Sequence, residues 1–205
     1  HVHGDGATAW GSTQGTFAYQ GGVARALDMD ASQVRVHCEY VGGGFGSKFG
    51  PDREGSLAAR MSQKYGKPCM VMCDRKQEHM DTGNRPGSFQ YMKIAADSEG
   101  KLLGGRIHAA SIVGHDEGRG GARNPALYDF GMVERTEEDI TLPTGLPRAM
   151  RSPGWPQGIF AVESMMDELA AQLGMDPLEF RRRNDPSARR IAQMERGAAI
   201  FGWDK

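Results

Sequence analysis

Residues Gly42–Lys48 combine residue types and spacing that could bind a polar ligand through the main chain. Four of these seven residues are glycines, and they surround a single phenylalanine, Phe45. Glycines packed this densely allow main-chain N–H groups to come close to a bound group, and such amides suit phosphate or oxo groups. The segment therefore predicts a loop that binds a large polar ligand, with a glycine-rich turn that has no ligand as the alternative.

Two better-known glycine motifs do not match this segment. A Walker loop needs a glycine before its lysine and a serine or threonine after it, but here Ser47 precedes Lys48 and Phe49 follows. A dinucleotide-binding fingerprint needs a third glycine where Ser47 stands, so that helix and strand can pack closely. The sequence therefore predicts neither a P-loop nor a Rossmann site.

Composition narrows the classes of partner. The chain has 205 residues and a net charge of −1, with acidic and basic residues interspersed. This balance predicts no nucleic-acid-binding surface, and no apolar run approaches the roughly 20 residues that span a bilayer. We therefore expect neither nucleic acid nor a membrane as a partner. Because the sequence opens on His1 rather than on methionine, we also expect it to start inside a longer protein.

The elements that must position the glycine loop can be read from periodicity. Strands are predicted at residues 7–11 and 33–40, and a weak helix at 16–27. A helix over 51–65, with Leu57, Met61 and Tyr65 on one face, follows the loop. Residues 68–73 are predicted as a buried strand, in which Cys69 and Cys73 serve as small core residues. This strand–loop–helix–strand order places the strands in one sheet.

The second half of the chain predicts a long β-hairpin and two helices. Two strands, at residues 88–96 and 102–113, are predicted to flank a turn at 97–101. Residues 114–150 are predicted to be irregular. Residues 162–173 have helical periodicity, and Asp176-Pro177 has the signature of a second helix start. Residues 187–205 are expected to begin a further structural unit that the sequence does not complete. The fold class is therefore α+β, with a mixed sheet, flanking helices and a long hairpin.

Five motifs in one order give these elements a family resemblance. They are Ser12–Gln14, Gly42–Lys48, Met150–Gly158, Glu163–Leu173 and Asp176–Glu179. The series resembles the molybdopterin-binding large subunit of the xanthine dehydrogenase and aldehyde oxidase family, and segments 49–52 and 83–86 look like its bacterial aldehyde oxidoreductase branch. The likeness covers about residues 7–203. It implies a first molybdopterin-binding domain in 1–185, truncated at its N-terminus, and an incomplete start of a second in 186–205.

The resemblance implies roles for individual residues. Gln14 matches the glutamine that hydrogen-bonds the apical oxygen of molybdenum. Arg151 matches a residue on the cofactor side of the second loop, which is the motif Met150–Gly158. Gln157 matches a pterin or dinucleotide contact. The backbone against the oxo ligand of the metal corresponds to Gly43, Gly44, Phe45 and Gly46. Gln14, Phe45 and Arg151 would thus surround the metal without ligating it. Taken singly, Gln14 is better explained as an exposed amide at a strand end and Arg151 as a member of a surface ion pair. Taken together, in the order of the family motifs, the two residues favour the roles at the cofactor.

Two positions bear on the substrate. Phe49 stands where the purine-oxidising members carry a glutamate, and Pro153 stands where relatives with aromatic substrates carry a stacking phenylalanine. This favours an aldehyde or an apolar aromatic substrate over xanthine. The general-base glutamate of the family is expected on a segment beyond this chain, since Glu39 and Glu54 flank the loop but match no catalytic position.

The implied reaction is hydroxylation of aldehydes or aromatic heterocycles with water as the oxygen source. Its cofactor would be molybdenum–molybdopterin, with the cytosine dinucleotide form favoured, and electrons would pass to 2Fe–2S and FAD centres on separate subunits. The chain by itself is expected to be inactive. The alternatives are a non-catalytic module for pterin or nucleotide binding or cofactor delivery, and a plain structural domain. For the compartment, the cytoplasm is favoured and the periplasm stays open.

Overall fold

The structure is a computed structural model, and it describes residues 1–114, 121–122 and 127–203. The chain divides into two compact units. The first contains His1–Arg85 and Gly145–Arg151, and the second contains Pro86–Thr144 and Ser152–Lys205. Helices and mixed sheets occur in both units, which confirms the predicted α+β class. No helix in the described ranges is long and apolar enough to cross a bilayer.

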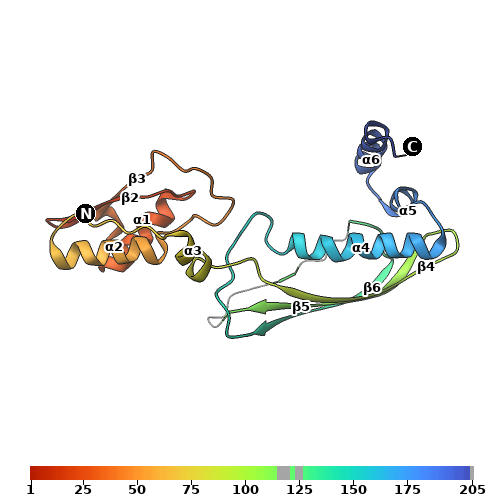
Figure 1. Ribbon diagram of the computed structural model, residues 1–205, viewed down its shortest axis with the longest axis horizontal. Helices are drawn as coiled ribbons and strands as arrows, with labels where there is room; N and C mark the ends of the chain where they lie inside the picture. The colour runs from red at the N-terminus through yellow and green to blue at the C-terminus, as the bar shows by residue number, and fades with distance from the viewer. Residues whose placement is uncertain (115–120, 123–126, 204–205) are drawn as a thin grey trace. The chain divides into compact units, whose positions relative to one another are not determined.

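The first unit is built on a small mixed sheet (Figure 1). Its strands are β1 (Val2–His3), β2 (Gly6–Trp10) and β3 (Val34–His37), in that order. β1 pairs with β2 antiparallel, whereas β2 and β3 are parallel, with Ala7 opposite Val34. Helix α1 (Thr16–Leu27) and the short 3₁₀ helix η1 (Ala31–Gln33) connect β2 to β3. A parallel pair needs such a crossover. The predicted strands at 7–11 and 33–40 are confirmed by β2 and β3, although β3 ends at His37, earlier than predicted.

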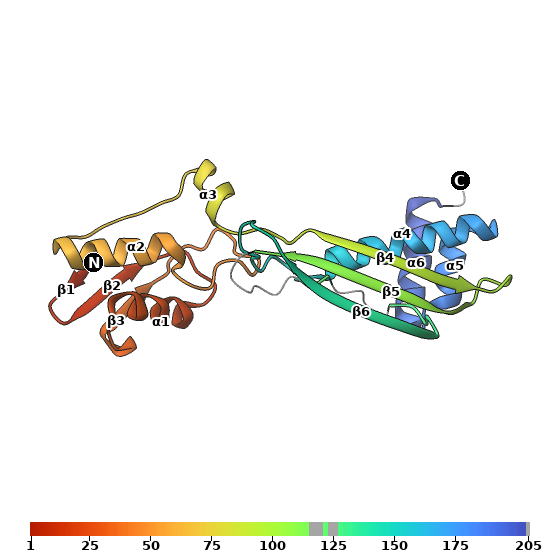
Figure 2. The same cartoon turned by 90° about the horizontal axis from the view of Figure 1, so that it is seen from below.

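Helices α1 and α2 (Asp52–Tyr65) pack on this sheet (Figures 1 and 2). Alternate residues of β2 and β3 point to the helices, because successive side chains of a strand face opposite ways. Val23 and Leu27 of α1 are fully buried against Ala7 and Val34. The buried strand residues stand at the beginnings of β2 and β3, with Ala9 and Val36 partly buried further along, and the chain leaves from the opposite ends toward Gln14 and the glycine loop.

Two predictions for the first unit are wrong. Residues 68–73 form no strand, because no described segment supplies a hydrogen-bonded partner, and Met70 and Met72 are exposed. Cys69 and Cys73 are half-buried free thiols rather than core residues. The predicted apolar face of α2 is also exposed, since that helix packs through Ala59 and the buried Ser62. A short helix, α3 (Arg75–Asp81), follows.

The second unit contains the predicted hairpin. β4 (Ser88–Ala96) and β5 (Leu102–Val113) pair antiparallel, with a register shift after Ala95. The assignment of 114–150 as irregular is wrong over β6 (Met132–Thr141), which pairs parallel with β5. β6 was missed because it is exposed on both faces and rich in Glu, and therefore shows no apolar alternation. Residues 115–120 and 123–126 of the segment lie outside the described residues.

Helix α4 (Trp155–Leu173) covers one face of this sheet (Figures 1 and 2). Its buried residues Val162, Met166 and Ala170 recur at helical spacing and pack with Phe180 of α5 (Pro177–Asn184). Asp176 accepts a hydrogen bond from the main-chain N–H of Glu179, as the predicted helix cap requires. Residues 187–205 contain helix α6 (Ala188–Phe201), which has no fully buried residue.

Candidate functional site

The glycine loop begins after β3 and meets the chain that leaves β2. Because β2 and β3 are parallel, both segments leave from the same edge of the sheet. The main-chain N–H of Gln14 donates to Lys48 O at 2.7 Å, and the buried Thr13 hydroxyl lies 3.1 Å from Lys48 O and 3.0 Å from Phe49 O. Sequence-distant Gln14 and the glycine loop are thus joined directly, as predicted.

The carboxamide of Gln14 has one defined orientation. Its Oε1 accepts the main-chain N–H of Gly46 at 2.9 Å and that of Lys48 at 3.2 Å. A main-chain N–H can only donate, so Oε1 and Nε2 cannot be interchanged. Nε2 donates to no other described residue. Gln14 therefore presents a free N–H donor from a side chain whose oxygen is held by the loop.

Gly44 is required by this arrangement. A Cβ at position 44 would lie 2.5 Å from Gln14 Oε1 and would overlap the rest of that carboxamide. Real Cβ atoms essentially never approach another atom so closely, so a side chain at residue 44 would displace Gln14. The close approach of the loop backbone to Gln14 is thus the reason for this glycine.

The loop also presents main-chain donors. Among the described residues, no hydrogen-bond acceptor is found for the main-chain N–H groups of Gly42, Gly43, Gly44 or Phe45. Phe45 has φ of +54°, which is unusual for a residue with a side chain, and its ring is 59% exposed. Consecutive unpaired N–H groups of this kind suit an anion or an oxo group.

Arg151 joins the same site from the second loop. Its main-chain N–H donates to Phe45 O at 2.6 Å. Its guanidinium makes no ion pair or hydrogen bond with the rest of the described chain, and the residue is exposed. The first unit therefore brings Gln14, residues 43–46 and Arg151 together, which matches the set predicted around the metal.

Other predicted residues lie in different surroundings. Phe49 is half exposed, with its ring against Gly15 in the first unit. Pro153 and Gln157 belong to the second unit, where Pro153 is exposed just before α4. Gln157 Nε2 donates to Pro86 O at 3.0 Å, and Gln157 O accepts from Gln90 Nε2 at 2.9 Å.

The side-chain oxygens of those two glutamines lack a hydrogen-bond partner in the described part of the second unit. Gln157 Oε1 and Gln90 Oε1 are both buried without a hydrogen-bond donor among the described residues. Buried acceptors are normally paired, so each unpaired one calls for an explanation. Because each oxygen is fully buried, neither is open to a bound ligand in this arrangement. Gln157 was predicted as a cofactor contact and stays a prediction, whereas Gln90 was not singled out, because a glutamine on a strand carries no signal of its own.

Three cationic side chains near the loop were also missed. Lys48 Nζ donates to Ser12 Oγ at 3.0 Å and to Val41 O at 3.1 Å. Arg85 donates to Arg151 O at 2.9 Å. Arg148 donates to the carbonyl of Ser47. Their partners are mostly main-chain carbonyls, which no sequence motif specifies, and only the proximity of Arg148 to Arg151 could have drawn attention to it.

The donor set determines what the site can bind. In the described ranges, no three His, Cys, Asp or Glu side chains lie together as metal ligands. The groups that the site offers to a ligand are the N–H donors of Gln14 and the glycine loop and the guanidinium of Arg151. These groups bind hydrogen-bond acceptors rather than a bare cation. The site is therefore suited to the oxo or phosphate groups of a cofactor that brings its own metal ligands.

Tyr19 packs closely against two glycines of the first unit. A Cβ at Gly11 would lie 2.5 Å from Tyr19 Cζ, and one at Gly55 would lie 2.9 Å from the Tyr19 hydroxyl, so both backbones approach this side chain closely. Burial, followed by the nearby carboxylates of Glu54 and Asp52, raises the pKa of the Tyr19 phenol. Tyr19 thus stays neutral and belongs to the core of the first unit.

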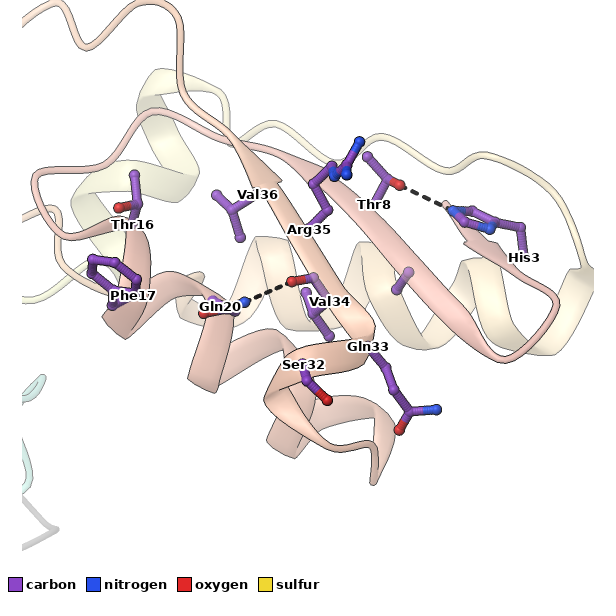
Figure 3. Close-up of a pocket in the computed structure, with 11 residues that line it drawn as sticks. His3, Thr8, Thr16, Phe17, Gln20, Ser32, Gln33, Val34, Arg35 and Val36 are labelled. Carbon is purple, nitrogen blue, oxygen red and sulfur yellow. Dashed lines mark hydrogen bonds between the residues drawn. The ribbon is translucent and has the colours of Figure 1, made fainter.

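A pocket of about 510 Å³ lies elsewhere in the first unit, beside β3 and the start of α1 (Figure 3). His3 Nε2 lies 3.0 Å from the Thr8 hydroxyl there, and Gln20 Nε2 donates to Val34 O at 2.7 Å. Its lining contains none of the predicted site residues. The loop site and this pocket are therefore separate features.

Comparison with known proteins decides the family. The profile of the molybdopterin cofactor-binding domain matches residues 1–185. The chain belongs to this family. It is 32% identical over 213 residues to the aldehyde oxidoreductase molybdenum-binding subunit PaoC of Escherichia coli K12, covering 96% of this chain and 29% of that protein. Identity to the putative xanthine dehydrogenase molybdenum-binding subunit XdhA of Escherichia coli K12 is 33% over 204 residues, covering 89% and 27%.

Solved structures agree with this family membership. The aldehyde oxidoreductase of Desulfovibrio gigas superposes with a TM-score of 0.76 at 28% identity, covering 87% of this chain and 20% of that one. The chain thus spans less than a third of the length of these relatives. The resemblance predicted from the five motifs is confirmed.

Proposed function

We propose that this chain forms the part of a molybdenum-dependent oxidoreductase that binds the molybdopterin cofactor beside its metal. The observation that carries the proposal is the hydrogen-bonded group of Gln14, the glycine loop and Arg151 at one edge of the first sheet. It offers a side-chain N–H, unpaired loop N–H groups and a guanidinium. Oxo and phosphate oxygens accept from all three kinds of donor.

Each of these residues has a role that its environment supports. Gln14 Nε2 would donate to an oxygen of the metal centre, while its Oε1 stays bound to the loop. The amides of Gly43 to Phe45 would donate to a second oxygen, and the Arg151 guanidinium would offset negative charge. When bound, the cofactor would supply two-electron oxidation of substrate and activation of water. The exposed Phe45 ring would limit water access beside the donors.

The whole-protein properties are part of the same proposal. The substrate would be an aldehyde or an aromatic heterocycle, with Phe49 and Pro153 near it, and the similarity to an aldehyde oxidoreductase subunit supports this. The pterin would carry the cytosine dinucleotide, with Gln157 as a contact, and 2Fe–2S and FAD subunits would accept the electrons. The general-base glutamate would come from a part of the protein that this chain does not include. Residues 1–185 would be one domain and 186–205 the start of the next.

The experiment measures the cofactor content of the purified protein first and its enzymatic activity second. The protein that carries this chain is purified, its molybdenum is measured by mass spectrometry, and the released pterin is analysed for cytidine monophosphate. Gln14→Ala and Arg151→Ala are compared with Gln193→Ala, whose exposed side chain on α6 serves as a matched control. We expect about one molybdenum per wild-type and control chain, and much less in the two site variants.

Aldehyde oxidation with a dye acceptor then separates the two function classes. Turnover that is lost in the site variants supports the enzyme. Bound molybdopterin without turnover of any aldehyde or heterocycle would instead indicate a binding or cofactor-delivery module. A wild-type protein that contains neither molybdenum nor pterin, when expressed in a host that makes the cofactor, would refute the proposal.

A further inference from the structure

Arg148 makes a set of contacts that differs from those of a surface arginine. Its side chain is only 26% exposed. Its Nε donates to Ser47 O at 2.7 Å and its Nη2 donates to the same oxygen, while Nη1 donates to Thr82 O at 3.0 Å. Nη2 also pairs with Asp52 Oδ2 at 2.5 Å. The guanidinium therefore joins the glycine loop, the start of α2 and the end of α3.

The peptide unit between Ser47 and Lys48 transmits the effect of these contacts. In a planar trans peptide, the C=O and N–H groups point in opposite directions. Arg148 binds the C=O of this unit, and the N–H on its other side donates to Gln14 Oε1 at 3.2 Å. Fixing the carbonyl therefore fixes the direction of the N–H, and with it the position of the Gln14 oxygen.

Holding the oxygen of Gln14 also fixes the direction of its Nε2 group, because both atoms belong to one planar carboxamide. With Oε1 held by the amides of Gly46 and Lys48, the plane of the carboxamide is set and Nε2 must point away from the loop. If the 47–48 peptide rotated, Lys48 would lose its bond to Oε1, and the carboxamide, held by Gly46 alone, could swing about that single bond and redirect Nε2. The free donor of the site thus depends on a residue that does not touch it.

The chemistry of arginine is needed for this role. A planar guanidinium can bind a carbonyl with two N–H groups and still donate to other acceptors in its plane. A lysine ammonium could pair with Asp52 but could not also hold both Ser47 O and Thr82 O in this fork geometry. Asp52, at the first position of α2, fixes the guanidinium from the opposite element.

We propose that Arg148 is a positioning residue, which sets the direction of the Gln14 Nε2 donor through the Ser47–Lys48 peptide. The proposal rests on the proposed function only in assuming that this donor binds an oxygen of the metal centre. The geometric part, from Arg148 to Gln14, holds whether or not cofactor is bound. It can therefore be tested on its own.

The test measures hydrogen exchange of individual main-chain amides, resolved by fragmentation mass spectrometry, in the purified protein that carries this chain. Gln14→Ala is the reference variant, because it removes the acceptor of Gly46 and Lys48 directly. Arg148→Ala is the test, and Arg53→Ala is the matched control, since Arg53 pairs with Asp81 on the exposed surface of the same unit. We expect Arg148→Ala to speed Lys48 exchange about 10- to 100-fold, the factor that corresponds to losing a hydrogen bond to a charged group.

The double variant separates positioning from general loosening of the loop. If Arg148 acts through Gln14, Arg148→Ala should add little to the exchange already raised by Gln14→Ala at Gly46 and Lys48. Unchanged Lys48 exchange in Arg148→Ala, or rates that multiply independently in the double variant, would overturn the proposal. If Arg148→Ala does not fold, Arg148→Lys takes its place, and it should raise Lys48 exchange while its circular dichroism spectrum stays native.

Molybdenum content is measured on the same samples. Faster Lys48 exchange together with a lower metal content in Arg148→Ala supports both the positioning role and the proposed function. Faster exchange in Arg148→Ala, when the wild-type protein never contains molybdenum, refutes the proposed function alone. Unchanged exchange in a protein that does contain molybdenum refutes the positioning role alone.

Discussion

The contact between Gly44 and Gln14 can be tested quantitatively by adding one methyl group. In Gly44→Ala, the new Cβ would lie 2.5 Å from Gln14 Oε1, so the carboxamide must leave its place. Gln14 is exposed and can move outward, at the loss of its hydrogen bonds from Gly46 and Lys48. At about 0.5–1.5 kcal/mol for each bond, we expect the free energy of unfolding to fall by about 1–3 kcal/mol.

A double-mutant cycle identifies the cause of that loss. Gln14→Ala alone should lower the free energy of unfolding by a similar amount, because it removes the same two bonds. In the Gln14→Ala background, Gly44→Ala has nothing left to displace. There we expect no loss, or a gain of about 0.4–1 kcal/mol from the stiffer unfolded chain. The two substitutions should therefore be strongly non-additive.

Urea titration followed by circular dichroism measures all four proteins. Gly42→Ala is the matched control, because a Cβ there meets open space, although φ of +68° makes it unfavourable. Its loss of about 1–2 kcal/mol should persist in the Gln14→Ala background, since it arises from the backbone alone. If the losses in the free energy of unfolding for Gly44→Ala and Gln14→Ala instead add to within about 0.5 kcal/mol, the close contact between Gly44 and Gln14 is wrong.

Three further predictions concern the donors and the second unit. Gln14→Glu keeps an acceptor for the loop amides but replaces the Nε2 donor with a negative charge, so the protein should fold normally and contain much less molybdenum by elemental mass spectrometry. Arg151→Ala should leave the free energy of unfolding within about 0.5 kcal/mol of wild type, because its guanidinium is exposed, while molybdenum content falls; a matching loss of stability would contradict this. Tyr128 donates to Glu163 Oε1 at 2.8 Å, and burial followed by that hydrogen bond raises its pKa. Its stabilising effect is complete below the unfolded tyrosine pKa of about 10 and is lost as pH rises through the higher folded value, so Tyr128→Phe should flatten the fall in stability in alkaline titrations.

The sequence was most informative where chemistry and main-chain geometry coincide. Gln14, the glycine loop and Arg151 were predicted as one site, and the structure joins them through main-chain hydrogen bonds. The predicted hairpin and the helix caps are also present, since they depend on local residue types. Arg148 could not be predicted, because its acceptors lie at positions far apart in the sequence and two of them are main-chain carbonyls.

The failures have a common physical origin. Residues 68–73 form a continuous apolar run like that of a buried strand. A strand also needs a neighbour that accepts and donates hydrogen bonds along its edge, and the sequence does not specify which neighbour is present. Strand β6 is the opposite case, a segment with no strand-like pattern that nevertheless forms a strand. It carries polar residues on both faces, as edge strands often do, and is a strand because β5 offers ten paired positions. Pairing partners, not propensity, decided both segments.

The left-handed conformation of Phe45 indicates why the two loops of the site depend on each other. A residue with a side chain at φ of +54° is less stable there than glycine by about 1–2 kcal/mol. Phe45 retains that conformation while its carbonyl accepts the N–H of Arg151 at 2.6 Å, and Arg85 in turn binds the carbonyl of Arg151. Because the second loop holds the first in an unfavourable backbone state, neither should keep its geometry alone. Binding of one ligand by both loops would therefore select a conformation that the chain has already formed, which reduces the ordering cost of binding.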